Sequence, residues 1–315
     1  MLSTLLIVLP IFALVLAGWL ARRIGVLGPN ATTELNRFVV YLALPALLFD
    51  ITSHAHWSDL WQPGFIAVFG ISTMLIFVVT VAVRLRGTRH LADAAIDGLN
   101  AGYANTAYMG FPITLAVLGH EALAPTTIAS IITVCVIFGF AIILIEVGLQ
   151  SEARTLHLIR KVGVSLACNP LLVAPALGAL FPISGFDVPA PAESFLKLLG
   201  GTASPCALVA LGLFLAAKPE TEAKTAPAVS NSTALLVGAK LVLHPIIAWV
   251  LASTVFDLTP TLTRTAVLLA ALPTGTGPFM LAEFYAREAA VTSRVILVST
   301  IISILTVSAY LAVSA

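Results

Sequence analysis

The sequence contains few charged residues, because only 10% of its 315 residues are Asp, Glu, Lys or Arg. Soluble domains carry about 25%. Hydrophobic residues make up 59% of the chain, and the mean hydropathy is +1.04. No soluble core can hide this much apolar surface, so the composition predicts an integral membrane protein in contact with the lipid bilayer. The net charge of +1 gives no basic excess that would indicate a nucleic-acid partner.

Cysteine is also scarce, and the three cysteines, Cys135, Cys168 and Cys206, all fall in apolar segments. They are too far apart for a CxxC motif, and an odd number cannot pair completely. We therefore predict that they are buried small residues, and neither disulfides nor metal ligands. The sequence further lacks HExxH, GxSxG and Walker A motifs and any paired aspartates of a prenyltransferase type. Enzymatic activity and ATP-driven transport are therefore not expected, and no cofactor or metal is predicted.

Long hydrophobic runs are abundant, and a spanning helix needs about 20 such residues. The first run lacks a basic region before it and continues into Arg22 and Arg23, so we interpret it as a spanning helix and not a signal peptide. Lipid-exposed backbone must satisfy its own hydrogen bonds, which predicts an all-α bundle. The predicted segments are 3–21, 37–54, 63–83, 95–118, 124–148, 159–181, 192–217, 232–255, 263–286 and 291–314.

Lysine and arginine concentrate in alternate loops, whereas loops 54–61, 119–125 and 181–191 contain neither. Because cytoplasmic loops of membrane proteins are enriched in these residues, both termini are predicted to be periplasmic in a bacterial inner membrane. Lys197, Lys240 and Arg264 fall outside this pattern. The residues that follow it are Arg22, Arg23, Arg37, Arg84, Arg86, Arg89, Arg154, Arg160, Lys161, Lys218, Lys224, Arg287 and Arg294.

The ten segments divide into two sets of five, residues 1–150 and 151–315. An odd number per half makes the second half begin on the opposite side of the membrane, so similar halves form an inverted repeat. Weak similarity is visible: "LALPALLF" matches "TASPCALVALGLF", and "GFPI" matches "TGPF". These matches align Pro45 with Pro205 and Pro112 with Pro278.

Two predicted helices are interrupted near their centres, in "NTAYMGFPI" (105–113) and "LPTGTGPF" (272–279). Proline removes a backbone donor, and such breaks in membranes are tolerated where the backbone faces protein or a cavity. Ordinary proline kinks would explain either break alone. Two breaks at matching repeat positions instead predict a substrate site where the helices cross, with open helix ends that favour an anion. The candidate residues are Asn105, Thr106, Gly110, Pro112, Pro273, Thr274, Thr276 and Pro278.

Four stretches carry a resemblance to a known family: "ELNRFVVYLALPALLF" (34–49), "NTAYMGFPI" (105–113), "LVALGLFLA" (208–216) and "AALPTGTGPFMLAEFY" (270–285). The chain resembles the auxin efflux carrier family, which includes plant PIN-type exporters and bacterial permeases linked to malonate and malate. The resemblance implies a fold like that of sodium–bile acid symporters. Helices 1, 2, 6 and 7 would form a scaffold domain, and helices 3–5 and 8–10 a transport domain with elevator-type motion.

The resemblance also implies roles for single residues and for assembly. In the plant carriers one asparagine at the helix-4 crossing and one in helix 6 hold the substrate carboxylate, and the matching positions are Asn105 and Asn169. An amide can donate to a carboxylate without placing full charge in the membrane. A homodimer through the scaffold is compatible with the same resemblance. The loop between the fifth and sixth segments has only about ten residues, far shorter than in the plant exporters.

Several other membrane residues are candidates for secondary roles. Pro45 and Pro205 are expected to kink their helices so that both helices line the cavity, with Phe49 as an apolar wall. Lys240 either reaches the cytoplasmic surface or pairs with a carboxylate, and Asp50 either reaches water or acts with a coupling ion. His244 is either a hydrogen-bonded structural residue or a proton-coupling group.

These observations predict a secondary active or facilitative transporter of small organic anions, with a carboxylate substrate of the malonate, malate or auxin type. One alternative is a sodium-coupled uptake symporter of the bile-acid type, although carboxylates are scarce around the crossing. Another is a membrane sensor or binding protein that does not transport. Sequence leaves open the substrate, the direction of flux, and whether Na⁺ or H⁺ is the coupling ion.

Overall fold

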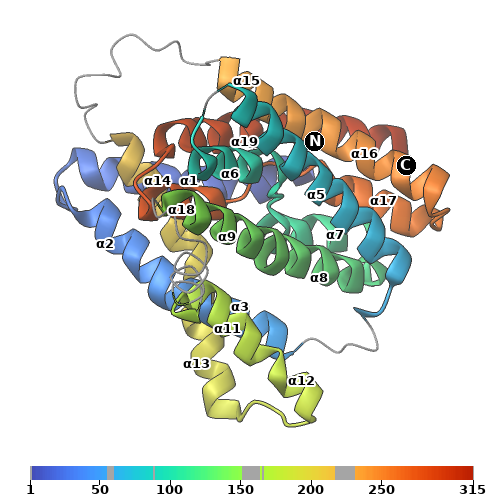
Figure 1. Cartoon of the computed structure of the whole chain (residues 1–315), viewed down its shortest axis with the longest axis horizontal. Helices are drawn as coiled ribbons and strands as arrows, with labels where there is room; N and C mark the ends of the chain where they lie inside the picture. Colours follow the sequence, from blue (N-terminus) through green and yellow to red (C-terminus); the bar gives the residue numbers. More distant parts are fainter. Residues whose placement is uncertain are drawn as a thin grey trace.

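The computed structural model describes residues 2–54, 60–87, 89–150, 164, 167–216 and 231–314. Every regular element within these ranges is helical, and none of them is a strand, which confirms the all-α prediction. The predicted loop residues Arg154, Arg160, Lys161, Lys218 and Lys224 lie outside the described ranges, as does the beginning of the predicted segment 159–181. Figure 1 shows both chain ends at the same end of the molecule.

The helices of residues 2–149 include short π-helical and 3₁₀ segments, labelled η, that continue neighbouring α-helices. They are α1 (Leu2–Arg23), α2 (Ala31–Phe38), η1 (Val39–Ala43), α3 (Leu44–Ser53), α5 (Pro63–Arg86), α6 (Leu91–Gly102), η2 (Thr106–Gly110), α7 (Phe111–Leu118), η3 (His120–Ala122), α8 (Leu123–Ile131), η4 (Ile132–Ile137) and α9 (Phe138–Leu149).

The helices of residues 170–314 likewise include long helices and helices divided by π-helical segments. They are α11 (Pro170–Gly178), α12 (Leu180–Ser184), α13 (Ala190–Gly201), α14 (Ala203–Ala216), α15 (Asn231–Gly238), η5 (Ala239–Leu243), α16 (His244–Val250), η6 (Leu251–Val255), α17 (Pro260–Ala270), α18 (Gly277–Phe284) and α19 (Ala289–Ser314).

Six helical stretches among the described residues are long and apolar enough to cross a membrane. They are Ala31–Ser53, Pro63–Arg86, His120–Leu149, Ala190–Ala216, Asn231–Val255 and Ala289–Ala312. Local chemistry sets their ends: α5 starts at a proline, which needs no helical N–H there, and carries Arg84 and Arg86 in its last turn. The predicted segments 95–118 and 263–286 are each divided into shorter helices.

Two sequence expectations are wrong in detail. Arg37 was expected between two helices but lies in the last turn of α2, because that helix extends beyond its apolar part through the polar segment "ATTELNRF". The cysteines were expected to be buried, but Cys168 is exposed and Cys135 and Cys206 are half-buried. Hydropathy reports the segment in which a residue lies, and the face of the helix decides its burial.

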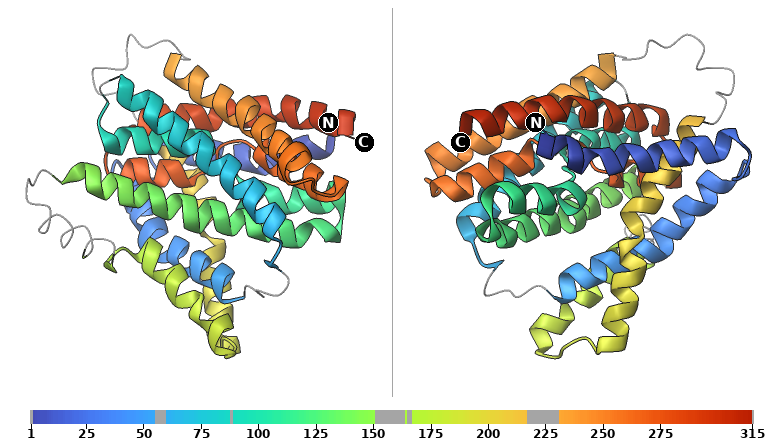
Figure 2. Two further views of the ribbon diagram at one scale, coloured as in Figure 1. Left: turned by 45° about the vertical axis from the view of Figure 1, so that its right-hand side comes forward. Right: turned by 180° about the vertical axis from the view of Figure 1, so that it is seen from behind.

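The helices pack in two groups. In the first group, α1 packs along α14, and α3 packs against α11 and α13. In the second group, α5 packs on α6, α6 on α9, α16 on α17, and α15 on α19. Figures 1 and 2 show α3, α11, α12 and α13 projecting from one side of the second group.

Glycines allow the closest contacts in the first group. A Cβ atom at Gly18 would overlap the backbone of Val209, and one at Gly212 would overlap the backbone of Val15. Small residues let membrane helices approach so closely that their backbones touch. The α1–α14 contact is therefore a backbone-to-backbone interface, with little tolerance for side chains.

Ion pairs join the ends of helices in the second group. Arg84 Nε on α5 lies 2.6 Å from Asp97 Oδ2 on α6, and Arg287, between α18 and α19, binds both oxygens of Asp93 on α6. The Asp93 carboxylate raises the pKa of the Arg287 guanidinium, chiefly through this hydrogen bond. These contacts tie elements from both halves of the chain into one unit.

Candidate functional site

The two interrupted helices meet at their interruptions. The helix α6 ends at Gly102 and α17 ends at Ala270, and helical structure resumes at Thr106 and Gly277. An isolated antiparallel bridge joins Ala104 to Thr274 across the gap. The breaks leave backbone N–H and C=O groups without helical hydrogen bonds, which would be energetically costly in lipid. Pairing across the gap satisfies some of these groups.

Two backbone hydrogen bonds form this bridge. The N–H of Asn105 donates to the carbonyl of Pro273 at 2.9 Å, and the N–H of Gly275 donates to the carbonyl of Tyr103 at 3.1 Å. Side chains add support, because Thr274 Oγ1 donates to the Asn100 carbonyl at 2.8 Å. The crossing is therefore held by the chain itself and does not need a ligand to form.

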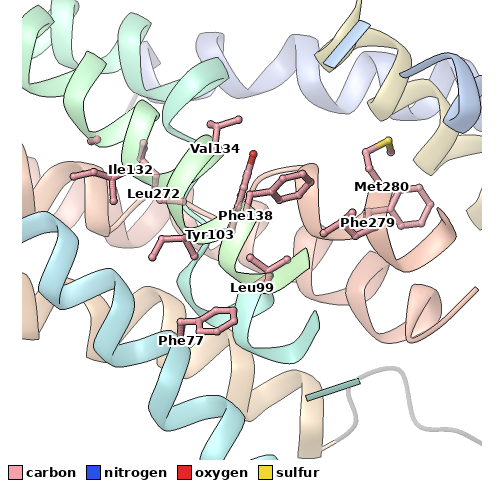
Figure 3. Packing of buried hydrophobic residues seen from close by; sticks show 14 of the residues in the cluster. Phe77, Leu99, Tyr103, Ile132, Val134, Phe138, Leu272, Phe279 and Met280 are labelled. Atoms are coloured by element: carbon pink, nitrogen blue, oxygen red, sulfur yellow. The ribbon is translucent and has the colours of Figure 1, made fainter. Parts of the chain in front are cut away.

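The ring of Tyr103 requires glycine at two positions in the second interrupted segment of the crossing. A Cβ atom at Gly275 would lie 2.8 Å from Tyr103 Cε1, and one at Gly277 would lie 2.6 Å from Tyr103 Cζ. The Tyr103 ring is buried and packs against Phe138, with 5.7 Å between ring centroids (Figure 3). The two glycines thus accommodate a ring that has little room to move.

A cavity of about 270 Å³ opens beside the crossing. One wall comes from the interrupted helices, through Asn105, Phe111, Thr276 and Met280. The opposite wall comes from the first packing group, through residues of α3, α13 and α14. The cavity therefore lies at the boundary between the two groups of helices.

The cavity is apolar with a few neutral polar groups, as small-molecule sites usually are. Its polar lining residues are Tyr103, Asn105, Ser204 and Thr276, and no charged side chain is among the described residues that line it. Thr276 and Gly277 also bring the N-terminus of α18 to the cavity wall. Pro278 has no N–H and the Phe279 N–H donates to the Thr276 carbonyl, so Gly277 supplies the N–H at this helix end, whose partial positive charge suits an anion.

The Asn105 side chain is the best-placed donor. Its backbone N–H is used by Pro273, and its carbonyl accepts from Met109 and Gly110. Its amide caps nothing in the following helix, and the residue is only half-buried. This amide is therefore available to a ligand without loss of a structural hydrogen bond.

The structure brings some predicted site residues to the cavity and places others behind it. Asn105 and Thr276 line the cavity. Pro273 and Thr274 build the bridge, and Thr106 is buried with no described partner for its hydroxyl. Gly110 and Pro278 are buried in the helices that resume after the breaks, and the side chain of Pro112 is outside the described part.

Three predicted residues of the first packing group do not line this cavity. Asn169 caps α11, where its Oδ1 accepts from the N–H of Leu171 at 3.0 Å. Pro45 is the second residue of α3, whose Leu47 and Ile51 do reach the cavity, and Phe49 packs its ring against Phe181.

The candidate coupling residues lie at two separate places. Lys240 and His244 are fully buried beside each other in the second group, with Lys240 Nζ 3.2 Å from His244 Nδ1. Asp50 lies near the end of α3, with its Oδ1 3.2 Å from His54 Nδ1. Asp50 lines a second cavity, which shares Ile51 and Phe111 with the first.

Sequence reasoning missed several lining residues. Ser204 contributes from α14, beside the expected Pro205, and Tyr103 contributes from the end of α6. The matched proline motif "TASPCALV" had marked Pro205 as equivalent to Pro45, which is a signal that could have pointed to Ser204 beside it. Tyr103 gave no signal, because only the packing shows that its ring lies under the glycines.

The family model described as "Membrane transport protein" matches residues 4–311, nearly the whole chain. The chain belongs to this membrane transport protein family. The resemblance to auxin efflux carriers is confirmed. Family membership identifies the protein as a multi-pass membrane transporter. The family and its relatives are transporters and not enzymes.

Three relatives illustrate the breadth of the family. The transporter is 31% identical over 306 residues to a Rhizobium meliloti (strain 1021) protein named "Putative malonate transporter", covering 97% of this chain and 94% of the relative. It is 24% identical over 356 residues to auxin efflux carrier component 8 of Arabidopsis thaliana, covering 96% and 94%. It is 29% identical over 210 residues to an uncharacterized transporter of Methanothermobacter thermautotrophicus, covering 66% and 67%.

Proposed function

We propose that this transporter carries small organic anions with a carboxylate group, of the malonate type. The observation that supports this most directly is the cavity at the crossing, where a free amide and a helix N-terminus face an otherwise apolar space. Neutral donors bind a carboxylate without leaving a buried charge unpaired when the site is empty. Malonate and auxin, named for two relatives, are both carboxylates.

The proposed fold has ten spanning segments in two inverted repeats, residues 1–150 and 151–315. Its support is the equivalent position of the breaks: α6 and η2–α7 in the first half, and α17 and α18 in the second. Termini at one end of the molecule agree with an even number of crossings (Figure 2). In this topology both termini are periplasmic in a bacterial inner membrane.

The proposed mechanism is an elevator-type movement of one helix group against the other. The first packing group corresponds to the scaffold, and the second, tied together by its ion pairs, corresponds to the transport domain. Because the cavity has one wall from each group, sliding of the second group would carry a bound anion from one membrane face to the other. A homodimer through the scaffold belongs to the same proposal.

Thermal stabilisation of the purified protein tests the substrate class. We expect malonate to raise the melting temperature. Malate and indole-3-acetate are measured for comparison, and each ligand is tested with and without Na⁺. A ligand that binds only the folded state stabilises by about 2.7 kcal/mol at 100 times its dissociation constant. Stabilisation that does not depend on Na⁺ would favour the present proposal over a sodium-coupled symporter.

The control is malonamide, which keeps the size of malonate and removes both charges. Stabilisation by malonamide but by no carboxylate would contradict an anion site. Uptake or efflux of radiolabelled malonate by proteoliposomes then separates transport from binding alone, and saturable binding with no flux would support the sensor alternative.

A further inference from the structure

Lys240 is a fully buried lysine in a predicted membrane-spanning segment. Its side-chain nitrogen donates to the carbonyl of Ala270 at 2.6 Å and contacts His244 Nδ1 at 3.2 Å. No carboxylate among the described residues forms an ion pair with it. An ammonium without a counter-charge in such a place is costly, so this group needs an explanation.

His244 continues the network to α5. His244 Nε2 lies 3.1 Å from Thr73 Oγ1, and Thr73 Oγ1 donates to the Phe69 carbonyl at the shorter distance of 2.7 Å. With the hydroxyl proton used by Phe69, His244 Nε2–H is the donor to Thr73, and Nδ1 is left as an acceptor for Lys240. The neutral imidazole is thus oriented to share a proton with the lysine.

The pair lies near the helix crossing that borders the proposed anion site. Ala270 is the last residue of α17 and precedes Pro273, the partner of the Asn105 N–H, by three residues. Three residues span at most about 10 Å, so the Lys240 nitrogen lies within a short distance of the crossing. The C-terminal end of a helix carries partial negative charge, which favours a cation at this position.

The surrounding elements bring no other titratable side chain into the pair within the described residues. Its neighbours α5, α6, α17 and α19 contribute Thr73, the Ala270 carbonyl and apolar contacts. The acidic residue Asp97 of α6 is held by Arg84 and Arg89, and Arg264 of α17 is exposed. A negative charge that balances a protonated pair must therefore come from elsewhere.

We propose that the Lys240–His244 pair, neutral when the anion site is empty, takes up one proton from the aqueous solution when a carboxylate binds at the crossing. The step is a single protonation: the carboxylate enters as an anion, one proton from solution binds a nitrogen of the pair, and the two opposite charges compensate each other across a low-dielectric interior. Binding of the anion and of the proton then favour each other equally, by thermodynamic linkage. This inference rests on the proposed function and identifies H⁺ as its coupling ion.

Isothermal titration of malonate into the purified protein tests the inference directly. Measuring the heat in two buffers of different ionisation enthalpy gives the number of protons exchanged per malonate bound. We expect net uptake approaching one proton in the wild type, and an affinity that falls with rising pH by up to about tenfold per pH unit, the limit for one linked proton. We expect neither effect in Lys240→Met.

Two further variants separate the charge from the fold. Lys240→Arg keeps the donor to Ala270 and a permanent charge, so it should bind malonate with no proton uptake and no pH dependence over the same range. Arg264→Met removes an exposed positive charge from α17, the helix whose Ala270 carbonyl accepts from Lys240, and should behave like the wild type. The arginine variant decides the question if the methionine variant does not fold.

Two results would contradict proton uptake by the Lys240–His244 pair and leave the anion site intact. One is malonate binding by the wild type without proton uptake. The other is uptake that persists in Lys240→Met or Lys240→Arg, which would show that the proton travels on the substrate. Absence of binding by every carboxylate would instead overturn the proposed function, and with it the pairing.

Discussion

Replacing Asn105 with alanine is expected to weaken malonate binding about 10- to 100-fold while leaving the melting temperature of the unliganded protein nearly unchanged. A hydrogen bond to a charged group contributes about 1.5–3 kcal/mol, and each 1.4 kcal/mol is a factor of ten in affinity. The fold should tolerate the change because the crossing uses the backbone of Asn105 and not its amide. Isothermal titration gives the affinity, and a thermal melt gives the stability.

Two companion variants make this result specific. Asn105→Asp keeps the size of the side chain and places a like charge at the cavity, so it should abolish carboxylate binding. Asn169→Ala removes the cap of α11, outside the cavity, and should cost about 1 kcal/mol of stability with little change in affinity. Unchanged malonate affinity in a folded Asn105→Ala protein would remove this residue from the site.

Replacing Gly212 with valine is expected to destabilise the transporter by about 3 kcal/mol or more, the upper part of the range for overpacking. Any Cβ atom at this position overlaps the backbone of Val15, and a backbone cannot move aside as a side-chain end can. The helices α1 and α14 would have to separate along the interface that Gly18 and Gly212 share. A thermal melt in detergent and the fraction of monodisperse protein measure the effect.

Gly238→Ala is the matched control for the Gly212 variant. Gly238 also lies in a helix, but a Cβ atom there meets nothing within 4 Å. Alanine at such a site should raise stability by about 0.4–1 kcal/mol, because it restricts the unfolded chain. If Gly212→Val melted at the temperature of Gly238→Ala, close packing of α1 and α14 would not be a source of stability.

The comparison of sequence and structure is most informative at the two broken helices. Proline and glycine act locally, so "NTAYMGFPI" and "LPTGTGPF" were enough to locate the interruptions. The bridge between Ala104 and Thr274, however, joins positions 170 residues apart, and no local pattern specifies such a pairing. The contribution of Ser204 to the cavity has the same origin, because it depends on where α14 packs.

Lys240 shows the limit of local reasoning for charged residues. Its position in an apolar segment marked it as unusual, but the sequence allowed either a route to the cytoplasmic surface or an ion pair. The structure instead gives it a helix carbonyl and an imidazole, and buries it completely. Arg37 is the simpler case: hydropathy began the predicted segment at residue 37, whereas the helix begins at Ala31, because helices extend beyond the apolar region that makes them detectable.

The sequence by itself determined that this protein is a helical membrane transporter, where its apolar segments lie, and where two of them break, because hydropathy and proline chemistry act over a few neighbouring residues. Tertiary structure alone decided which breaks meet, which amide remains free at the cavity, and what surrounds the buried lysine. Those properties arise from contacts between helices that are distant in the chain. Close packing at glycines and aromatic rings decides which helices meet, and no single segment contains that information.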